Sequence, residues 1–394
     1  MMEYFTVDQL ASEEVPPEFV NAVEDSFTTF SYARQFKDEG WRLLGYFPVY
    51  FPEELARSLG FHTVRLLGAS GRVALDIATA HTQSFVCSIS RSVFQLLKQG
   101  NLDVFDVLIF SNICDVARNL SGIVKRNIKN GMHVDYIHYP INNTFSAAVD
   151  YLVDELKRVA EGLEHVSGRK ISSDTLAVNL KLFNEKRRLQ RELLRLKMEK
   201  PWAASYVDVY VALRAGGIME PTRYNEMLRA YLERLKASEG RRYEKVRVMV
   251  FGDFCEQPPL PLFRVIEDAG CYIVNDESNI GSYWIGEVNN NGGDPLHALA
   301  KAYVQDPDPL TVRFHPGIDK KSYIIDAVKR VGAEAVIFCT PKFCEPALYD
   351  YVVYKTALHK AGIPTLHIEY EESSSSFEQA RLQAESFVES IIFD

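Results

Sequence analysis

Short runs of apolar, strand-forming residues that alternate with helical stretches constrain the fold of this chain more than any other feature of its sequence. In the first half these runs are Leu44–Tyr50, His62–Leu67 and Asp106–Phe110. The third run is apolar after its first residue, which is typical of a strand buried on both faces of a parallel sheet. The stretch Pro52–Leu55 predicts a helix start, because proline suits the first turn and acids suit the positive end of the helix dipole. Strands alternating with helices predict an α/β domain over residues 41–149.

The alternation returns in the second half of the chain. The predicted strands there are Val246–Phe251, Cys271–Val274, Ala335–Cys339 and Pro364–Glu369. The predicted helices are Leu260–Ala269, Ser322–Val331, Tyr351–Ala361 and Phe377–Ile391. This pattern predicts a second α/β domain over residues 241–394, so we expect two Rossmann-like lobes with parallel sheets.

Residues 150–240 carry a different pattern. Leucines recur there at mostly helical spacing among many Lys, Arg and Glu residues, and strand signals are nearly absent. We therefore predict a helical segment that joins the two lobes. The charge run Glu185–Arg188 is expected on a solvated helix face, because acids are interleaved with the bases. Residues 1–40 are predicted to form an N-terminal helical arm.

Charge and hydropathy exclude several classes of protein. Lys and Arg number 44 against 53 Asp and Glu, and the resulting net charge of −9 gives no support for general nucleic-acid binding. No apolar run approaches the roughly 18 residues that a membrane span needs. The stretch Met1–Leu10 lacks the basic and apolar regions of a signal peptide. We expect a cytoplasmic protein with neither a nucleic-acid nor a membrane partner.

The chain has six cysteines, which are Cys87, Cys114, Cys255, Cys271, Cys339 and Cys344. They are too sparse for a disulfide scaffold in a cytosolic chain of 394 residues. No two of them form a CxxC pair, which excludes a zinc ribbon and a thioredoxin motif. Two interpretations remain open: the cysteines are small buried hydrophobic residues, or a few of them converge on a metal or a cluster.

Most of these cysteines lie beside predicted strand ends or helix starts. Cys114 and Cys344 each follow a strand and precede a helix, Cys255 follows a strand, and Cys87 precedes the helix Ser90–Leu97. Ligands of open α/β sheets bind at the carboxyl ends of strands, and a helix N-terminus favours a thiolate. We therefore take Cys87, Cys114 and Cys344 as candidate ligands of a soft metal between the lobes, with Cys255 in reserve. Cys271 and Cys339 lie inside predicted strands and are expected in the core.

Three thiolates from distant parts of a chain suit an iron–sulfur cube that leaves one iron open to a non-protein ligand. Zinc is an alternative, although it usually brings closely spaced pairs or histidine ligands. Nearby histidines are His81, His133 and His138. The pattern alone leaves both the metal and the core interpretation open.

Several segments in the same order resemble the family of 2-hydroxyacyl-CoA dehydratase and benzoyl-CoA reductase cluster-binding subunits. They are Gly45–Leu55, Gln83–Ser92, Asn112–Leu120, Lys342–Pro346 and Gly362–Pro364. Within the family the chain resembles most the smaller reductase component, known as the gamma or C component, through Glu199–Trp202, Phe254–Leu260 and Ala269–Val274. One departure is Gln379–Phe387, where family members often have a Thr-Arg-x-Glu-Ala-Phe stretch, so no role is transferred to the last helix.

The resemblance implies a 4Fe–4S cluster on Cys87, Cys114 and Cys344, and an oxidoreductase that works as an anaerobic heterotetramer. It implies as partners a sister cluster-binding subunit, ATP-hydrolysing subunits that activate the electron, reduced ferredoxin and an acyl-CoA substrate. This chain has no P-loop, so ATP is expected to act on the partners. The predicted reaction reduces benzoyl-CoA to a cyclic dienoyl-CoA. The alternatives are a 2-hydroxyacyl-CoA dehydratase subunit, or an electron-relay subunit without its own substrate pocket.

A CoA ester carries phosphates, so a chain with net negative charge needs local cations to bind it. Arg91 follows Cys87 by one helical turn and Arg118 follows Cys114 by four residues, which makes both candidate contacts to a CoA ester or to the surroundings of the cluster. The alternative is that they are ordinary surface charges. Asp115, Glu256, Glu345 and His81 lie near cysteines in the sequence, but none is assigned as a proton donor.

Overall fold

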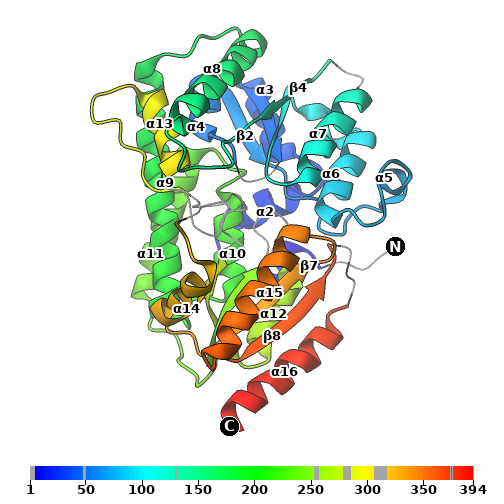
Figure 1. Cartoon of the computed structure of the whole chain (residues 1–394), viewed down its shortest axis with the longest axis vertical. Coiled ribbons are helices and arrows are strands. Elements are labelled where there is room, and N and C mark those ends of the chain that lie inside the picture. Colours follow the sequence, from blue (N-terminus) through cyan, green and yellow to red (C-terminus); the bar gives the residue numbers. More distant parts are fainter. Residues whose placement is uncertain are drawn as a thin grey trace.

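The computed structural model describes residues 5–47, 50–128, 131–252, 257–277, 285–305, 317–372, 374 and 376–393. It contains two four-stranded sheets, each with a helical cover (Figure 1). The first sheet consists of β1 (Arg42–Phe47), β2 (Phe61–Arg65), β3 (Val107–Ser111) and β4 (His133–Ile137). The second consists of β5 (Val246–Gly252), β6 (Cys271–Asp276), β7 (Ala335–Pro341) and β8 (Thr365–Tyr370). The predicted α/β fold with two lobes is confirmed.

Both sheets are parallel throughout and share one topology. Their strand orders are β2-β1-β3-β4 and β6-β5-β7-β8. In each sheet the order reverses between the first and third strands in sequence. Such a reversal opens a crevice at the carboxyl ends of the strands, where open α/β sheets bind their ligands.

The helices of the first lobe precede, separate or follow its strands. They are α1 (Val7–Leu10), α2 (Pro17–Asp25), α3 (Ser31–Asp38), α4 (Glu53–Ser58), α5 (Asp76–His81), α6 (Ser88–Lys98), the short 3-10 helix η1 (Asn101–Val104) and α7 (Asp115–Asn127). In the second half they are α12 (Leu260–Asp268), α13 (Pro295–Gln305), α14 (Lys320–Val331), α15 (Glu345–Lys360) and α16 (Glu378–Phe393). None of the described helices is long and apolar enough to cross a membrane.

Four helices join the lobes, namely α8 (Ala148–Ser167), α9 (Ser173–Glu199), α10 (Tyr206–Ala215) and α11 (Pro221–Ala237). Helix α9 packs against α4 of the first lobe and against β6 of the second, and α10 packs against α2 and α12. Figure 1 shows α9 and α11 along one side of the molecule. The helical segment therefore braces both lobes.

The charge run Glu185–Arg188 is not wholly solvated, which corrects the prediction. Lys186 and Arg187 are buried, and they form ion pairs with Glu53 (2.8 Å for Lys186) and Glu54 at the start of α4. Carboxylates that are buried with the bases offset the cost of removing these charges from water. The residue spacing along α9 does not reveal these partners, which lie more than a hundred residues earlier in the chain.

Several elements were not predicted, among them helix α5, strand β4 and helix α13. Strand β4 is at the edge of its sheet and is only partly buried, so His133 and Asp135 interrupt its apolar pattern. Helix α13 follows β6 in sequence but packs against α8 and α9. The second half of the chain thus returns to the side of the first lobe at α13. The predicted domain boundaries at residues 40, 149 and 240 stay a prediction.

Candidate functional site

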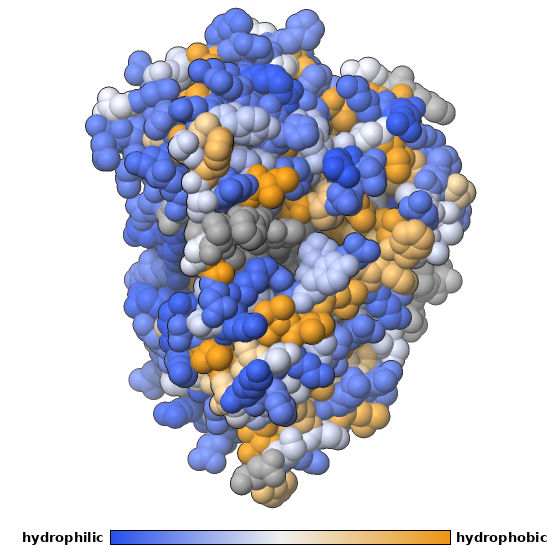
Figure 2. Space-filling model, viewed as in Figure 1, coloured by the Kyte–Doolittle hydropathy of each residue, from blue (hydrophilic) through white to orange (hydrophobic). Residues whose placement is uncertain are grey.

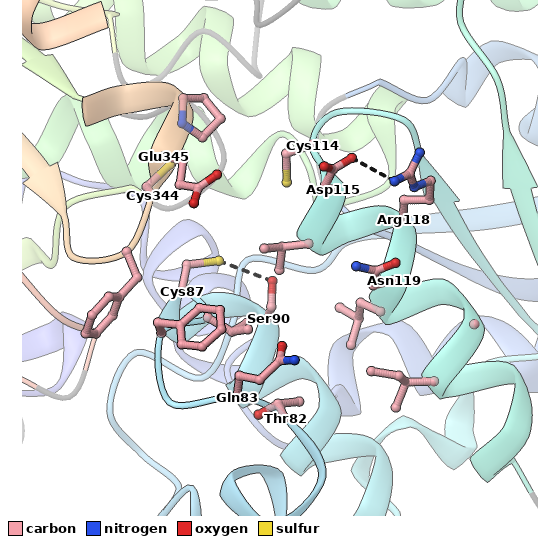
Figure 3. Close-up of a pocket in the computed structure, with 18 of the residues that line it drawn as sticks. Thr82, Gln83, Cys87, Ser90, Cys114, Asp115, Arg118, Asn119, Cys344 and Glu345 are labelled. Carbon is pink, nitrogen blue, oxygen red and sulfur yellow. Dashed lines mark hydrogen bonds and ion pairs between the residues drawn. The ribbon is translucent and has the colours of Figure 1, made fainter. Parts of the chain in front are cut away.

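A cavity of ≈ 1100 Å³ lies between the two lobes. The first lobe contributes the end of α5, the loop that leads into α6, and the first turns of α7. The second lobe contributes Lys320 at the start of α14 and the turn from β7 into α15. Cys87, Cys114 and Cys344 all line this cavity (Figure 3). The three candidate ligands, which are far apart in sequence, are therefore brought to one place.

Each of these cysteines is the N-cap residue of a helix: Cys87 of α6, Cys114 of α7 and Cys344 of α15. At this position the unpaired amides and the helix dipole favour a negatively charged sulfur. The Ala117 backbone N–H donates to Cys114 Sγ at 3.4 Å. Cys87 Sγ lies 3.2 Å from Ser90 Oγ. Phe343, which precedes Cys344, has a positive φ of 65°, which turns the chain sharply between β7 and α15.

The chemistry of these donors fits an iron–sulfur cluster. Among the residues that the structure describes, no three His, Cys, Asp or Glu side chains converge closely enough to hold one metal ion. A cluster binds its thiolates through different iron atoms, so its ligands surround a volume rather than a point. Three N-cap thiols around one cavity are compatible with such an arrangement.

Of the other three cysteines, the two that the structure describes do not line the cavity. Cys255 and Glu256 lie outside the described residues. Cys271 on β6 and Cys339 on β7 are fully buried, which confirms that they belong to the core. Burial raises the pKa of the Cys271 thiol to about 12 and raises the pKa of Cys339 as well. Both thiols stay protonated at neutral pH.

The two candidate arginines differ in their positions. Arg118 lines the cavity and forms an exposed ion pair with Asp115 at 3.0 Å. Arg91 is half-buried and is not among the lining residues. The Arg91 backbone N–H donates to the Cys87 carbonyl at 3.4 Å, so the two residues are one turn apart, but the Arg91 side chain does not line the cavity.

Two further cations line the cavity. Arg126 lies further along α7, and Lys320 approaches from the second lobe, where its Nζ pairs with Asp350 at 2.6 Å. Asp115, Glu345 and His81 also line the wall. No local pattern singles out Lys320, because it lies some two hundred residues from the first-lobe part of that wall.

Aromatic side chains surround the cavity. Phe85 and Tyr349 line it and are largely exposed, at 63% and 73%. Figure 2 shows hydrophobic surface gathered between the lobes on this face. Behind α7, burial raises the pKa of Tyr136 to about 12, and nearby Arg118 opposes the shift. The cavity thus combines three cysteine thiols, charged side chains and an apolar rim.

Two α/β lobes with parallel sheets face each other across a cysteine-lined cavity, and comparisons with known proteins show the family of this chain. It belongs to the 2-hydroxyglutaryl-CoA dehydratase D-component family, whose model matches residues 48–391. This membership confirms the resemblance that the sequence motifs indicated.

Individual relatives cover nearly the whole chain. A benzoyl-CoA reductase subunit of Thauera aromatica, the C component of that enzyme, is 34% identical over 92% of this chain and 94% of its own length. Lactoyl-CoA dehydratase subunit beta of Anaerotignum propionicum is 28% identical over 89% and 92%. The beta subunit of (R)-2-hydroxyglutaryl-CoA dehydratase of Acidaminococcus fermentans is 27% identical over 91% and 94%. These relatives are all named as subunits, so the chain is related to components of multi-subunit enzymes.

Proposed function

We propose that this chain is a cluster-carrying subunit of an ATP-dependent benzoyl-CoA reductase, with a 4Fe–4S cluster on Cys87, Cys114 and Cys344. The observation that carries the proposal is the placement of these three N-cap cysteines, from both lobes, on one cavity. The choice of a reductase is supported by the 34% identity to a benzoyl-CoA reductase subunit, against 28% and 27% for the two dehydratase subunits.

The chain's own residues would bind the cluster and shape the reaction site. When bound, the cluster would supply low-potential electrons one at a time. The apolar rim around Phe85 and Tyr349 would exclude water, and a low-dielectric environment favours a low reduction potential. Arg118, Arg126 and Lys320 would attract the phosphates of a CoA ester to the mouth of the cavity.

The electrons and ATP would come from other subunits and from reduced ferredoxin. A sister cluster-binding subunit and ATP-hydrolysing subunits complete the proposed complex. Arg91 stays a candidate only for the surroundings of the cluster, because it does not line the cavity.

A second candidate function is a 2-hydroxyacyl-CoA dehydratase subunit. The family description and the two dehydratase relatives favour it. Both functions would use the same cysteines, so the cavity alone does not separate them; the products do.

The test is anaerobic purification of the chain with its partners, followed by iron and sulfide analysis and EPR. Cys114→Ala and Cys344→Ala should lose most of the iron, whereas Cys339→Ala, a buried cysteine off the cavity, should keep it. Retention of full iron in the triple variant of Cys87, Cys114 and Cys344 would refute the ligand assignment.

The reaction is tested with the same preparation. Benzoyl-CoA, ATP and reduced ferredoxin should yield a product that has gained two hydrogens. Loss of water from a 2-hydroxyacyl-CoA, without reduction of benzoyl-CoA, would replace the reductase proposal with the dehydratase.

A further inference from the structure

Helix α6 presents a hydroxyl group to the sulfur of its own N-cap residue. Cys87 is the N-cap and Ser90 is the third residue of the helix (N3). Their Sγ and Oγ atoms are 3.2 Å apart, as the dashed line in Figure 3 marks. Ser90 is only 2% exposed, and it lines the cavity beside Cys87. The contact is therefore shielded from bulk water and faces the volume that the three cysteines surround.

The orientation of this hydroxyl differs from that of its neighbour. Helix serines commonly donate to a backbone carbonyl of the preceding turn. Ser92 of the same helix does so, with its Oγ donating to the Ile89 carbonyl at 3.1 Å. Ser90 instead contacts the sulfur. A thiolate bound to iron has no proton, so in the loaded protein Ser90 is the only member of this pair that can donate.

The other two cysteine-capped helices have no hydroxyl at the same position. The N3 residue of α7 is Ala117 and that of α15 is Ala347. In α7 it is the backbone N–H of Ala117 that reaches Cys114 Sγ. A side-chain donor at N3 is thus particular to α6 among these three helices.

We propose that the Ser90 hydroxyl donates a hydrogen bond to the Cys87 thiolate and thereby raises the reduction potential of the cluster. This inference rests on the proposed function, and it assigns Ser90 as a positioning and tuning residue. Hydrogen bonds to cluster sulfurs stabilise the more negative, reduced state more than the oxidised state. Removal of the donor should therefore make the cluster harder to reduce.

The test uses two variants of nearly equal shape that differ in the hydroxyl, Ser90→Thr and Ser90→Val. Both are prepared anaerobically in the full complex, and the midpoint potential of the cluster is measured by EPR at controlled potentials. Ser90→Val should shift the midpoint to more negative values than the wild type, whereas Ser90→Thr should stay close to it. Ser121→Ala on α7 is the control, because the Ser121 hydroxyl donates to the Arg118 backbone carbonyl at 2.7 Å and does not line the cavity; it should leave the midpoint unchanged.

Iron and sulfide contents separate the possible outcomes. If the wild-type complex holds no cluster, the proposed function fails and this inference fails with it. If the wild type holds the cluster and the Thr and Val variants share one midpoint, only the inference is overturned. Ser90→Ala provides a smaller variant in case valine prevents folding. If Ser90→Val and Ser90→Ala both lose iron while Ser90→Thr keeps it, the hydroxyl is needed to bind the cluster, and its proposed role in setting the midpoint potential is overturned.

Discussion

Glu372 connects the two lobes close to the cavity, and its ionisation should make the stability of the protein depend on pH. It lies just after β8 in the second lobe. The Ser70 backbone N–H of the first lobe donates to its carboxylate, and its own N–H donates to Ser88 Oγ at 3.1 Å. Ser88 is the first residue of α6, next to Cys87. This contact therefore ties the second lobe to the helix that carries one candidate ligand.

Burial raises the pKa of Glu372 from 4.5 to about 7, although hydrogen bonds from Ser92 and Ser70 and the charge of Arg214 oppose the shift. Because the folded-state pKa exceeds the unfolded value, the folded protein binds more protons between these two pH values. The free energy of unfolding should fall by about 1.4 kcal/mol per pH unit across this window, about 3 kcal/mol in all. The contribution is complete below about pH 4.5 and is lost as the pH rises through 7.

The assay compares urea-induced unfolding of the wild type and Glu372→Gln from pH 4.5 to 8. Glutamine cannot ionise, so the variant should gain about 3 kcal/mol relative to the wild type as the pH rises. Glu371→Gln is the matched control. The Glu371 carboxylate, next to Glu372 in the sequence, forms a partly exposed ion pair with Lys342 at 3.3 Å. A difference between wild type and Glu372→Gln that does not vary with pH would refute this reasoning.

Two other buried ionisable side chains, His62 and Lys197, give predictions of their own. Burial lowers the pKa of His62 to about 4, so the unfolded state binds the proton first. The wild type should therefore lose up to about 3 kcal/mol in its free energy of unfolding as the pH falls from 6.5 to 4, and His62→Gln should not show this loss in urea unfolding. Lys197→Met should cost about 3–5 kcal/mol, because it leaves the Glu267 carboxylate buried without its 3.0 Å partner. Arg264→Met, which breaks the exposed pair with Asp268, should change the same unfolding free energy by less than about 1 kcal/mol; equal effects of the two substitutions would contradict the burial argument.

The sequence reveals elements that carry a clear local pattern and hides those whose pattern is interrupted or whose packing depends on distant contacts. Strand β3 is buried at every position, and its unbroken apolar run is enough to predict it. Strand β4 lies at the edge of its sheet and is partly exposed. The polar residues His133 and Asp135 interrupt its apolar run, so the sequence does not reveal it. The packing of α13 against α8 depends on contacts between distant segments, which no local pattern records.

The same distinction applies to the candidate site. Cys114 and Cys344 can be singled out because each stands between a strand and a helix, a local position that the sequence reveals. Helical spacing places Arg91 one turn after Cys87, as the structure does, but it does not reveal that the Arg91 side chain lies off the cavity. Ser90 escapes prediction from the sequence, because its role depends on the direction of one hydroxyl.

The two lobes supply two of the three cysteines in equivalent ways. Cys114 follows β3 and Cys344 follows β7, each the third strand of its sheet in sequence and each beside the reversal of strand order. Either lobe alone therefore offers an incomplete set of ligands, and a cluster on all three cysteines requires the lobes to be held together. Cys87 has no counterpart in the second lobe, yet its helix is the one that Glu372 reaches through Ser88. This contact between the lobes thus lies beside Cys87, the cysteine without a counterpart, so weakening it should shift Cys87 relative to Cys344.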